Sequence, residues 1–134
     1  MTGGCLCGRV RFEAAGKPAR TVACHCTFCQ RCTGSAFALW PTYPQADVTI
    51  AGTLAVYEHH SDESGRWIRM HFCPRCGTSV ASTWEGDPGE IALLGGAFDD
   101  TRWLAVDRHV WTRSKQHWFA LPPGAVAFEK SSRR

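Results

Sequence analysis

Short runs in which polar and apolar residues alternate recur along most of this sequence. Residues 9–14 read Arg-Val-Arg-Phe-Glu-Ala, and residues 67–72 read Trp-Ile-Arg-Met-His-Phe. A period of two is typical of strands that bury one face. Similar short runs, separated by Gly, Pro and Asp, occupy residues 20–23, 37–40, 46–50, 54–58, 78–84 and 90–94. The pattern therefore predicts a mainly β fold of packed antiparallel sheets.

Turn residues and helix signals add connections to this β pattern. A Gly-Thr dipeptide separates the runs at residues 46–50 and 54–58, which predicts that these two runs form a hairpin. We also expect one or two short helices. The first follows Cys29 and stops at Gly34, and the second lies near residues 114–118.

The length and composition suit one domain. The chain has 134 residues, 44% of them hydrophobic, including six Trp and seven Phe. Residues 1–134 are therefore expected to form a single domain around its own core. The basic tail at residues 130–134 is expected to be disordered. No apolar run approaches the ~20 residues that a membrane-spanning helix needs, so we expect no membrane partner.

Eight cysteines in three tight clusters give the strongest chemical signal. The clusters are Cys5 with Cys7, then Cys24, Cys26, Cys29 and Cys32, and then Cys73 with Cys76. Side chains two residues apart on a strand point to one side, and a tight turn brings together the ends of a Cys-x-x-Cys motif. Zn–S bonds of ~2.3 Å in a tetrahedron need sulfurs placed this closely. The clusters therefore predict metal binding, with zinc as the expected ion.

Disulfide bonds are the alternative use of clustered cysteines. The chain starts Met-Thr-Gly-Gly, with no charged segment followed by an apolar run, so we expect no signal peptide and a cytoplasmic protein. In that reducing compartment clustered cysteines favour metal binding over disulfides. A redox Cys-x-x-Cys motif is disfavoured because no βαβ pattern accompanies it.

The spacing divides the cysteines into two sets. The first and third clusters each adjoin a predicted strand, and together they complete a closed four-thiolate site of the structural kind. Its ligands are Cys5, Cys7, Cys73 and Cys76. The middle cluster then binds a second ion through Cys24, Cys26 and Cys29, which leaves one tetrahedral position open, as in catalytic zinc sites. Cys32 could close that position as a fourth ligand, so spacing alone leaves both forms as alternatives.

The net charge of +3 points to no particular partner once metal binding is counted. Seven thiolates with two Zn²⁺ ions would bring the charge to about zero. Outside the tail, the basic residues are spread along the chain and form no stripe. We therefore expect no nucleic-acid partner, and we predict no particular oligomeric state.

Three cysteine motifs and a later glycine-rich motif carry a family pattern. They are Gly4-Cys5-Leu6-Cys7-Gly8-Arg9-Val10-Arg11-Phe12, Cys24-His25-Cys26-Thr27-Phe28-Cys29-Gln30-Arg31, Phe72-Cys73-Pro74-Arg75-Cys76-Gly77-Thr78 and Gly95-Gly96-Ala97-Phe98-Asp99-Asp100. In these motifs the chain resembles the glutathione-dependent formaldehyde-activating enzyme (GFA) family, which shares its domain with centromere protein V. The resemblance runs from Gly4 to about Phe128.

This resemblance implies a fold, two metal ions and an activity. The fold is that of the Mss4-like group (β-tent). The implied ions are a structural zinc on Cys5, Cys7, Cys73 and Cys76 and a second, catalytic-type zinc on Cys24, Cys26 and Cys29. The implied activity is that of a carbon–sulfur lyase, S-(hydroxymethyl)glutathione synthase, whose partners are the thiol glutathione and the aldehyde formaldehyde. Cys32 departs from the family pattern, in which a non-cysteine residue is expected.

Residues near the second ion are candidates for supporting roles. His25 alternates between two ligands, so its side chain should point away from the metal and hydrogen-bond behind it. Arg31 is the nearest cation, although a solvated helix position is its ordinary role. Four arginines are candidates for binding the carboxylates of glutathione through two hydrogen bonds each, and they are Arg9, Arg11, Arg69 and Arg75. The six tryptophans are expected to be core residues or pocket walls, and they are Trp40, Trp67, Trp84, Trp103, Trp111 and Trp118.

Two functions follow from the two forms of the second site. An open three-thiolate zinc suits an enzyme that adds a thiol to an aldehyde. A site closed by Cys32 suits a binding module without catalytic activity, stabilised by two four-cysteine zinc ions. Metal content after mutation of Cys32 distinguishes the two.

Overall fold

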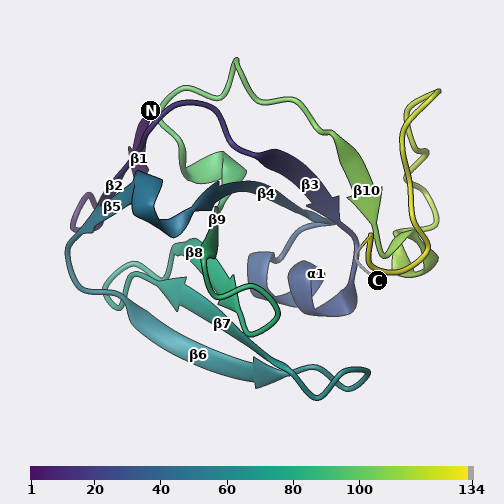
Figure 1. Ribbon diagram of the computed structural model, residues 1–134, viewed down its shortest axis with the longest axis horizontal. Coiled ribbons are helices and arrows are strands. Elements are labelled where there is room, and N and C mark those ends of the chain that lie inside the picture. Colours follow the sequence, from purple (N-terminus) through teal and green to yellow (C-terminus); the bar gives the residue numbers. More distant parts are fainter. Residues whose placement is uncertain (133–134) are drawn as a thin grey trace.

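A computed structural model describes residues 1–132, and it has two β-sheets and one short α-helix (Figure 1). The mainly β, antiparallel architecture predicted from the alternating pattern is confirmed. The strands are β1 Thr2–Gly4, β2 Arg11–Ala14, β3 Arg20–Cys24, β4 Ala38–Pro44, β5 Val48–Ala51, β6 Ala55–His60, β7 Trp67–Phe72, β8 Ser79–Trp84, β9 Glu90–Leu93 and β10 Arg108–Val110. The helices are α1 Thr27–Thr33 and the 3₁₀ helices η1 Gln45–Asp47, η2 Gly95–Ala97 and η3 Thr112–Ser114.

The larger sheet has seven strands in the order β10-β3-β4-β9-β8-β7-β6. Neighbouring strands in it are antiparallel except β10, which runs parallel to β3 and pairs Val110 with Cys24. Strands β3 and β4 place Val22 opposite Trp40. The end of β3 therefore lies between two strands, and that is where the middle cysteine cluster begins.

The smaller sheet has the order β1-β2-β5 and corrects the predicted hairpin. Strand β5 pairs with β2, with Ile50 opposite Phe12, whereas β6 pairs with β7 in the other sheet. Gly52 is the point of departure between the sheets, because its φ is +99° and a Cβ there would lie 2.3 Å from the carbonyl oxygen of Arg9. The prediction was wrong because Gly-Thr marks a crossing between two sheets and not a two-residue turn within one.

Helix α1 begins earlier than predicted, and the second expected α-helix is absent from the described chain. Cys26 is the N-cap of α1, and Gly34 ends the helix with a φ of +62°. The predicted stop at Gly34 is thus confirmed, whereas the start lies before Cys29. Near residues 114–118 only the short η3 is found, and it ends at Ser114.

Two clusters of buried side chains form the interior, and each one includes cysteines. One contains Phe12, Tyr43 and Leu93 together with Cys5 and Cys73. The other contains Trp40, Met70 and Val110 together with Cys24 and Cys29. The sulfur atoms therefore lie at the margins of packed apolar groups, which exclude water from them.

The C-terminal segment is expected to be disordered over residues 130–134, of which residues 133–134 lie outside the described part. In the described part, the N–H of Trp111 donates to the carbonyl oxygen of Lys130 over 3.0 Å. The side chain of Lys130 lies 3.8 Å from the carboxylate of Glu63. Within residues 1–132 no helix is both long enough and apolar enough to span a membrane.

Candidate metal centres and the adjoining pocket

Four cysteines from two distant turns meet at one point. Cys5 and Cys7 lie between β1 and β2, and Cys73 and Cys76 lie between β7 and β8. Their sulfur atoms all lie within 4.8 Å of one another. The Sγ atoms of Cys5 and Cys7 are 3.6 Å apart, and those of Cys7 and Cys73 are 3.8 Å apart. We call this set the four-cysteine group.

Both turns of the four-cysteine group are shaped by a glycine and by backbone hydrogen bonds. Gly8 and Gly77 each follow a cysteine and have φ values of +79° and +75°. The N–H of Gly77 donates to the carbonyl of Cys73 over 2.9 Å, which closes the second turn. In the first turn, the N–H of Val10 donates to the sulfur of Cys5 over 3.3 Å. In the first turn the backbone thus points a donor at the sulfur of Cys5, which favours the thiolate form of that sulfur.

Thr78 connects the two turns through its hydroxyl group. The N–H of Leu6 donates to Oγ1 of Thr78 over 3.1 Å, so the hydroxyl can give its own hydrogen to the sulfur of Cys76, 3.2 Å away. This hydrogen bond is the main cause that lowers the pKa of Cys76 to about 5. The spacing of the cysteines gives no indication of this role for Thr78.

The middle cluster forms a second group at the junction of β3 and α1. The sulfurs of Cys24, Cys26 and Cys29 all lie within 4.8 Å of one another. Cys24 ends β3, and its sulfur is 3.3 Å from that of Cys26, the N-cap of α1. The N–H of Cys29 donates to the sulfur of Cys26 over 3.3 Å, and the indole N–H of Trp40 donates to the sulfur of Cys29 over 3.4 Å. We call this set the three-cysteine group.

The thiols of the three-cysteine group shift one another's pKa in opposite directions. Hydrogen bonds from the side chains of Cys24 and Cys29 lower the pKa of Cys26 to about 3. The same contact with Cys26 raises the pKa of Cys24 to about 12, and contacts with Cys24 and Cys26 raise that of Cys29. Ionisation of one thiol thus opposes ionisation of the other two, because like charges this close repel each other. A divalent cation allows all three to ionise, so this donor set fits a thiophilic metal such as zinc.

Cys32 lies outside the three-cysteine group. Its sulfur approaches the carbonyl oxygen of Cys29, one helical turn back, at 3.5 Å. It also lines a hollow of about 640 Å³ whose wall includes Cys5 and Cys76. The structure therefore brings together three of the four cysteines in the middle cluster. Cys32 contacts the side chain of Cys29 but lies outside that set.

The two supporting candidates next to these ligands occupy different environments. His25 is fully buried, and its Nε2 lies 3.0 Å from Nδ1 of His109. Its Nδ1 has no hydrogen-bond partner within the described residues. The His25 carbonyl accepts hydrogen bonds from Gln30 and from Ser114, which hold the backbone between the two ligands. Arg31 is exposed on α1.

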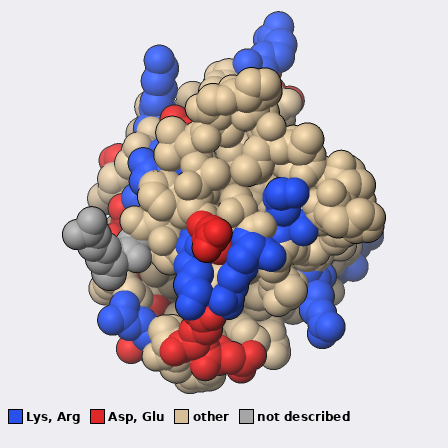
Figure 2. Space-filling model, turned by 90° about the vertical axis from the view of Figure 1, so that its right-hand side faces the viewer, with Lys and Arg blue, Asp and Glu red and all other residues tan. Residues whose placement is uncertain are grey.

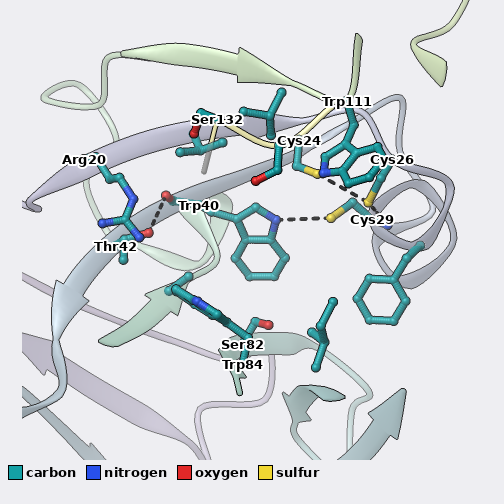
Figure 3. Close-up of a pocket in the computed structure, with 16 residues that line it drawn as sticks. Arg20, Cys24, Cys26, Cys29, Trp40, Thr42, Ser82, Trp84, Trp111 and Ser132 are labelled. Carbon is teal, nitrogen blue, oxygen red and sulfur yellow. Dashed lines mark hydrogen bonds between the residues drawn. The ribbon is translucent and has the colours of Figure 1, made fainter. Parts of the chain in front are cut away.

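A cavity of about 260 Å³ opens beside the three-cysteine group, and all three of its cysteines line it. Three tryptophans form much of its wall, namely Trp40, Trp84 and Trp111 (Figure 3). In Figure 3 the indole of Trp40 lies in the middle of the view with its nitrogen toward Cys29. Trp118, in contrast, is 64% exposed and lines neither this cavity nor a core. We call this cavity the aromatic pocket.

None of the four arginines weighed for substrate binding lines the aromatic pocket. Arg11 pairs with Asp99, and Arg69 pairs with Glu58. The arginine that does line the pocket is Arg20, which was not among the candidates. It could have been found, because Arg20 and Cys24 are four residues apart on one strand and share a face.

These features define a mainly β domain with two groups of cysteines that can hold metal ions, one of four sulfurs and one of three beside a pocket. The chain belongs to the glutathione-dependent formaldehyde-activating enzyme family, whose sequence pattern matches residues 1–114. None of the curated proteins compared with the chain matches it. A crystal structure of a Rhodobacter sphaeroides protein is similar, with 21% sequence identity, a TM-score of 0.59, and coverage of 96% of this chain and 99% of that chain. At this identity the likeness supports the fold alone.

Proposed function

We propose that this protein is a zinc enzyme that adds a thiol to a small aldehyde at the three-cysteine group. Glutathione and formaldehyde are the proposed reactants, in keeping with the family description. The observation that carries the proposal is the difference between the two groups. One has four sulfurs, whereas the other has three and faces a pocket large enough for a small molecule.

The proposed ions have different tasks. Cys5, Cys7, Cys73 and Cys76 would hold a structural zinc that ties the β1–β2 turn to the β7–β8 turn, since four thiolates complete its coordination. Cys24, Cys26 and Cys29 would hold the second zinc. Bound there, zinc supplies a positive charge that favours the thiolate form of a substrate thiol and polarises a carbonyl oxygen.

The chain's own groups orient the sulfurs of the second site. The N–H of Cys29 holds the sulfur of Cys26, and the indole N–H of Trp40 holds that of Cys29. Both donors withdraw negative charge from the ligands, which offsets the charge excess of three thiolates around a divalent ion. The aromatic walls keep bulk water away from the reacting groups.

The reaction balances without an oxidant or a reductant. The thiol sulfur forms a bond to the carbonyl carbon, and the π-electron pair of the carbonyl moves onto its oxygen. The proton of the thiol ends on that oxygen, so the product is a hemithioacetal. The reverse sequence breaks the same carbon–sulfur bond, which is the sense in which the activity is that of a lyase.

The remaining assignments follow from this activity. We place the protein in the cytoplasm, where glutathione keeps thiols reduced. Its partners are a small thiol and a small aldehyde, and no nucleic acid. On the face shown in Figure 2, basic and acidic side chains stand next to one another, and much of the surface is uncharged. This face therefore offers no single-sign basic patch of the kind that a phosphate backbone needs.

Metal analysis and exchange kinetics test the proposal together. We expect two zinc ions per chain, one of which is lost on mild chelation, and an accelerated exchange between glutathione, formaldehyde and their adduct in two-dimensional exchange NMR. Cys24→Ser should remove the labile ion and the acceleration, while Cys32→Ser, the matched control at the fourth cysteine of the same cluster, should retain both. A Cys24→Ser protein as active as its parent would contradict the proposal.

The alternative is a binding module in which Cys32 completes a second four-thiolate site. One observation favours this alternative. The side chain of Cys32 contacts that of Cys29, and this contact lowers the pKa of Cys32, as a metal ligand requires. Two results together would favour the binding module over the enzyme. The Cys32→Ser variant would lose the second zinc ion, and neither the parent nor this variant would accelerate the exchange between glutathione, formaldehyde and their adduct.

A further inference from the structure

The lining of the aromatic pocket is mainly apolar, whereas glutathione carries three charged groups. Its walls are formed largely by Trp40, Trp84, Trp111 and Phe28 together with aliphatic side chains such as Ile68. A volume of about 260 Å³ exceeds the ~150 Å³ of an engineered cavity that binds benzene. A single aromatic ring with a short substituent therefore fits into this volume. The aromatic side chains of the wall can pack against such a ring on several sides.

Apart from the cysteines, the one charged side chain among the described residues of the aromatic pocket is that of Arg20, and it is already engaged. Arg20 donates through Nη1 to Oε1 of Glu90 over 2.8 Å and through Nη2 to the other carboxylate oxygen. In Figure 3 Arg20 lies at the end of the pocket away from the cysteines. The two carboxylates and the ammonium of glutathione would have to lose their water here without a comparable set of partners, which is costly.

The position of Trp111 is held by an unusual backbone conformation. It is the one described residue other than glycine with a positive φ, of 57°. Its N–H donates to the carbonyl of Lys130, and its carbonyl accepts from the N–H and the hydroxyl of Ser114. The guanidinium of Arg113 lies 5.1 Å from the centre of its ring. Such a conformation persists where surrounding contacts hold it, and it is common at functional sites. Here it fixes the indole at the wall beside Cys26.

A second hollow, the outer hollow, shares part of its wall with the aromatic pocket. Cys26, Phe28, Ile68 and Trp111 line both the aromatic pocket and this outer hollow. The outer hollow is also lined by charged residues of both signs, and these are Asp62, Glu63 and Arg113. Of the three-cysteine group, Cys26 thus lies between the aromatic pocket and a hollow with charged side chains. Glu63 and Arg113 form an ion pair with each other, and both side chains are exposed. A zwitterionic thiol such as glutathione suits this side better than the aromatic pocket, because its carboxylates and its ammonium can keep their water there.

From these observations we propose that the aldehyde substrate carries an apolar, preferably aromatic, group that occupies the aromatic pocket. The aldehyde carbon then lies at the cysteine end, and the charged parts of the thiol stay in the outer hollow. The inference rests on the proposed function and narrows its substrate class from any small aldehyde to aldehydes of the benzaldehyde type. Formaldehyde, which has no side group, leaves the pocket unfilled.

Binding of benzyl alcohol to the zinc-loaded protein tests the pocket without any reaction. It has the size of benzaldehyde but no electrophilic carbon, and its binding can be followed by NMR titration. Val22→Phe, which fills the pocket from β3, should weaken this binding at least about tenfold, since the ring loses its apolar contact area. Val48→Phe, at a partly buried strand position beside the other core, is the matched control and should bind as the parent does.

A second pair of variants changes the wall without filling the space. Trp84→Leu should weaken benzyl alcohol binding, while Trp103→Leu, at the other core, should not. In exchange kinetics the parent should favour benzaldehyde over formaldehyde in kcat/KM, and Val22→Phe should reverse that preference. Absence of saturable binding, or equal binding by the pocket variants and their controls, would overturn the inference.

The outcomes also separate this inference from the proposed function. Exchange with formaldehyde that is accelerated by a protein without benzyl alcohol binding means that the addition activity stands and the aromatic preference falls. Saturable binding in the aromatic pocket with no accelerated exchange of either aldehyde means that the proposed activity falls, and the aldehyde assignment of the pocket falls with it.

Discussion

The indole N–H of Trp40 donates a hydrogen bond to the sulfur of Cys29 over 3.4 Å. Trp40 comes from the middle of β4, and Cys29 comes from the first turn of α1. This contact joins the sheet to the helix at the three-cysteine group. It also places a tryptophan that lines the aromatic pocket in direct contact with a proposed metal ligand.

Replacing Trp40 with phenylalanine should weaken metal binding at the three-cysteine group alone. The ring is kept, but the sulfur of Cys29 loses its donor, and losses of this kind cost about 10–100-fold in metal affinity. Competition with a chromogenic chelator measures the affinity of both sites. Trp103→Phe, beside the other core, is the control. Equal losses from both sites would show that Trp40 acts through general stability.

The hydroxyl of Thr78 should contribute in the same way to the four-cysteine group. Thr78→Val keeps the shape of the side chain but removes the hydrogen bond that lowers the pKa of Cys76. We expect faster zinc loss to a chelator from this group, by about tenfold or more. Thr83→Val is the control, because it also removes a hydroxyl with a partner, the His71 ring, away from any cysteine. A loss rate unchanged by Thr78→Val would contradict the assignment.

Gly77→Ala should destabilise the fold through the backbone and not through crowding. A Cβ at Gly77 meets nothing within 4 Å, but the φ of +75° costs an L-residue about 1–2 kcal/mol. Gly96→Ala is the matched control, because Gly96 also has open space around its Cβ and no positive φ is recorded for it. Urea unfolding of the zinc-loaded proteins measures both. Equal destabilisation by the two substitutions would refute the backbone explanation.

Asp99 should make a contribution to stability that disappears in acid. Its pKa is lowered to about 2, first by hydrogen bonds from the guanidinium of Arg11 and then by that from the hydroxyl of Thr2. A carboxylate whose folded pKa is lowered stabilises the fold above its ordinary pKa of 3.8, and this stabilisation is lost as the pH falls toward 2. The ion pair is about half exposed, so the effect is small.

The comparison of Asp99→Asn with the parent protein at each pH isolates this effect. Acid also protonates the cysteine thiols, but it does so in both proteins. The difference in urea midpoint should be present at about pH 6 and shrink toward pH 2. A difference that stays constant over this range would show that the Asp99 carboxylate contributes nothing through its charge.

The sequence by itself determined the chemistry that is local along the chain. Close cysteine spacing places sulfurs together through the geometry of a turn or a strand, so the candidate ligands follow from the spacing alone. The alternation of polar and apolar residues likewise predicted the mainly β architecture, which the fold confirms, because a period of two needs only one buried face. Gly34 was found as a helix end because αL geometry favours glycine.

Tertiary structure decided what depends on partners distant in the sequence. Whether residues after Gly52 turn back on β5 or cross to another sheet depends on whether β6 pairs with the outer edge of β5 or with β7, which no local pattern encodes. The same holds for the contact of Trp40 with Cys29 and for the placement of Arg20 in the pocket. The position of Cys32 depends on the rotation of α1 about its axis, and packing of the helix against the sheet sets that rotation.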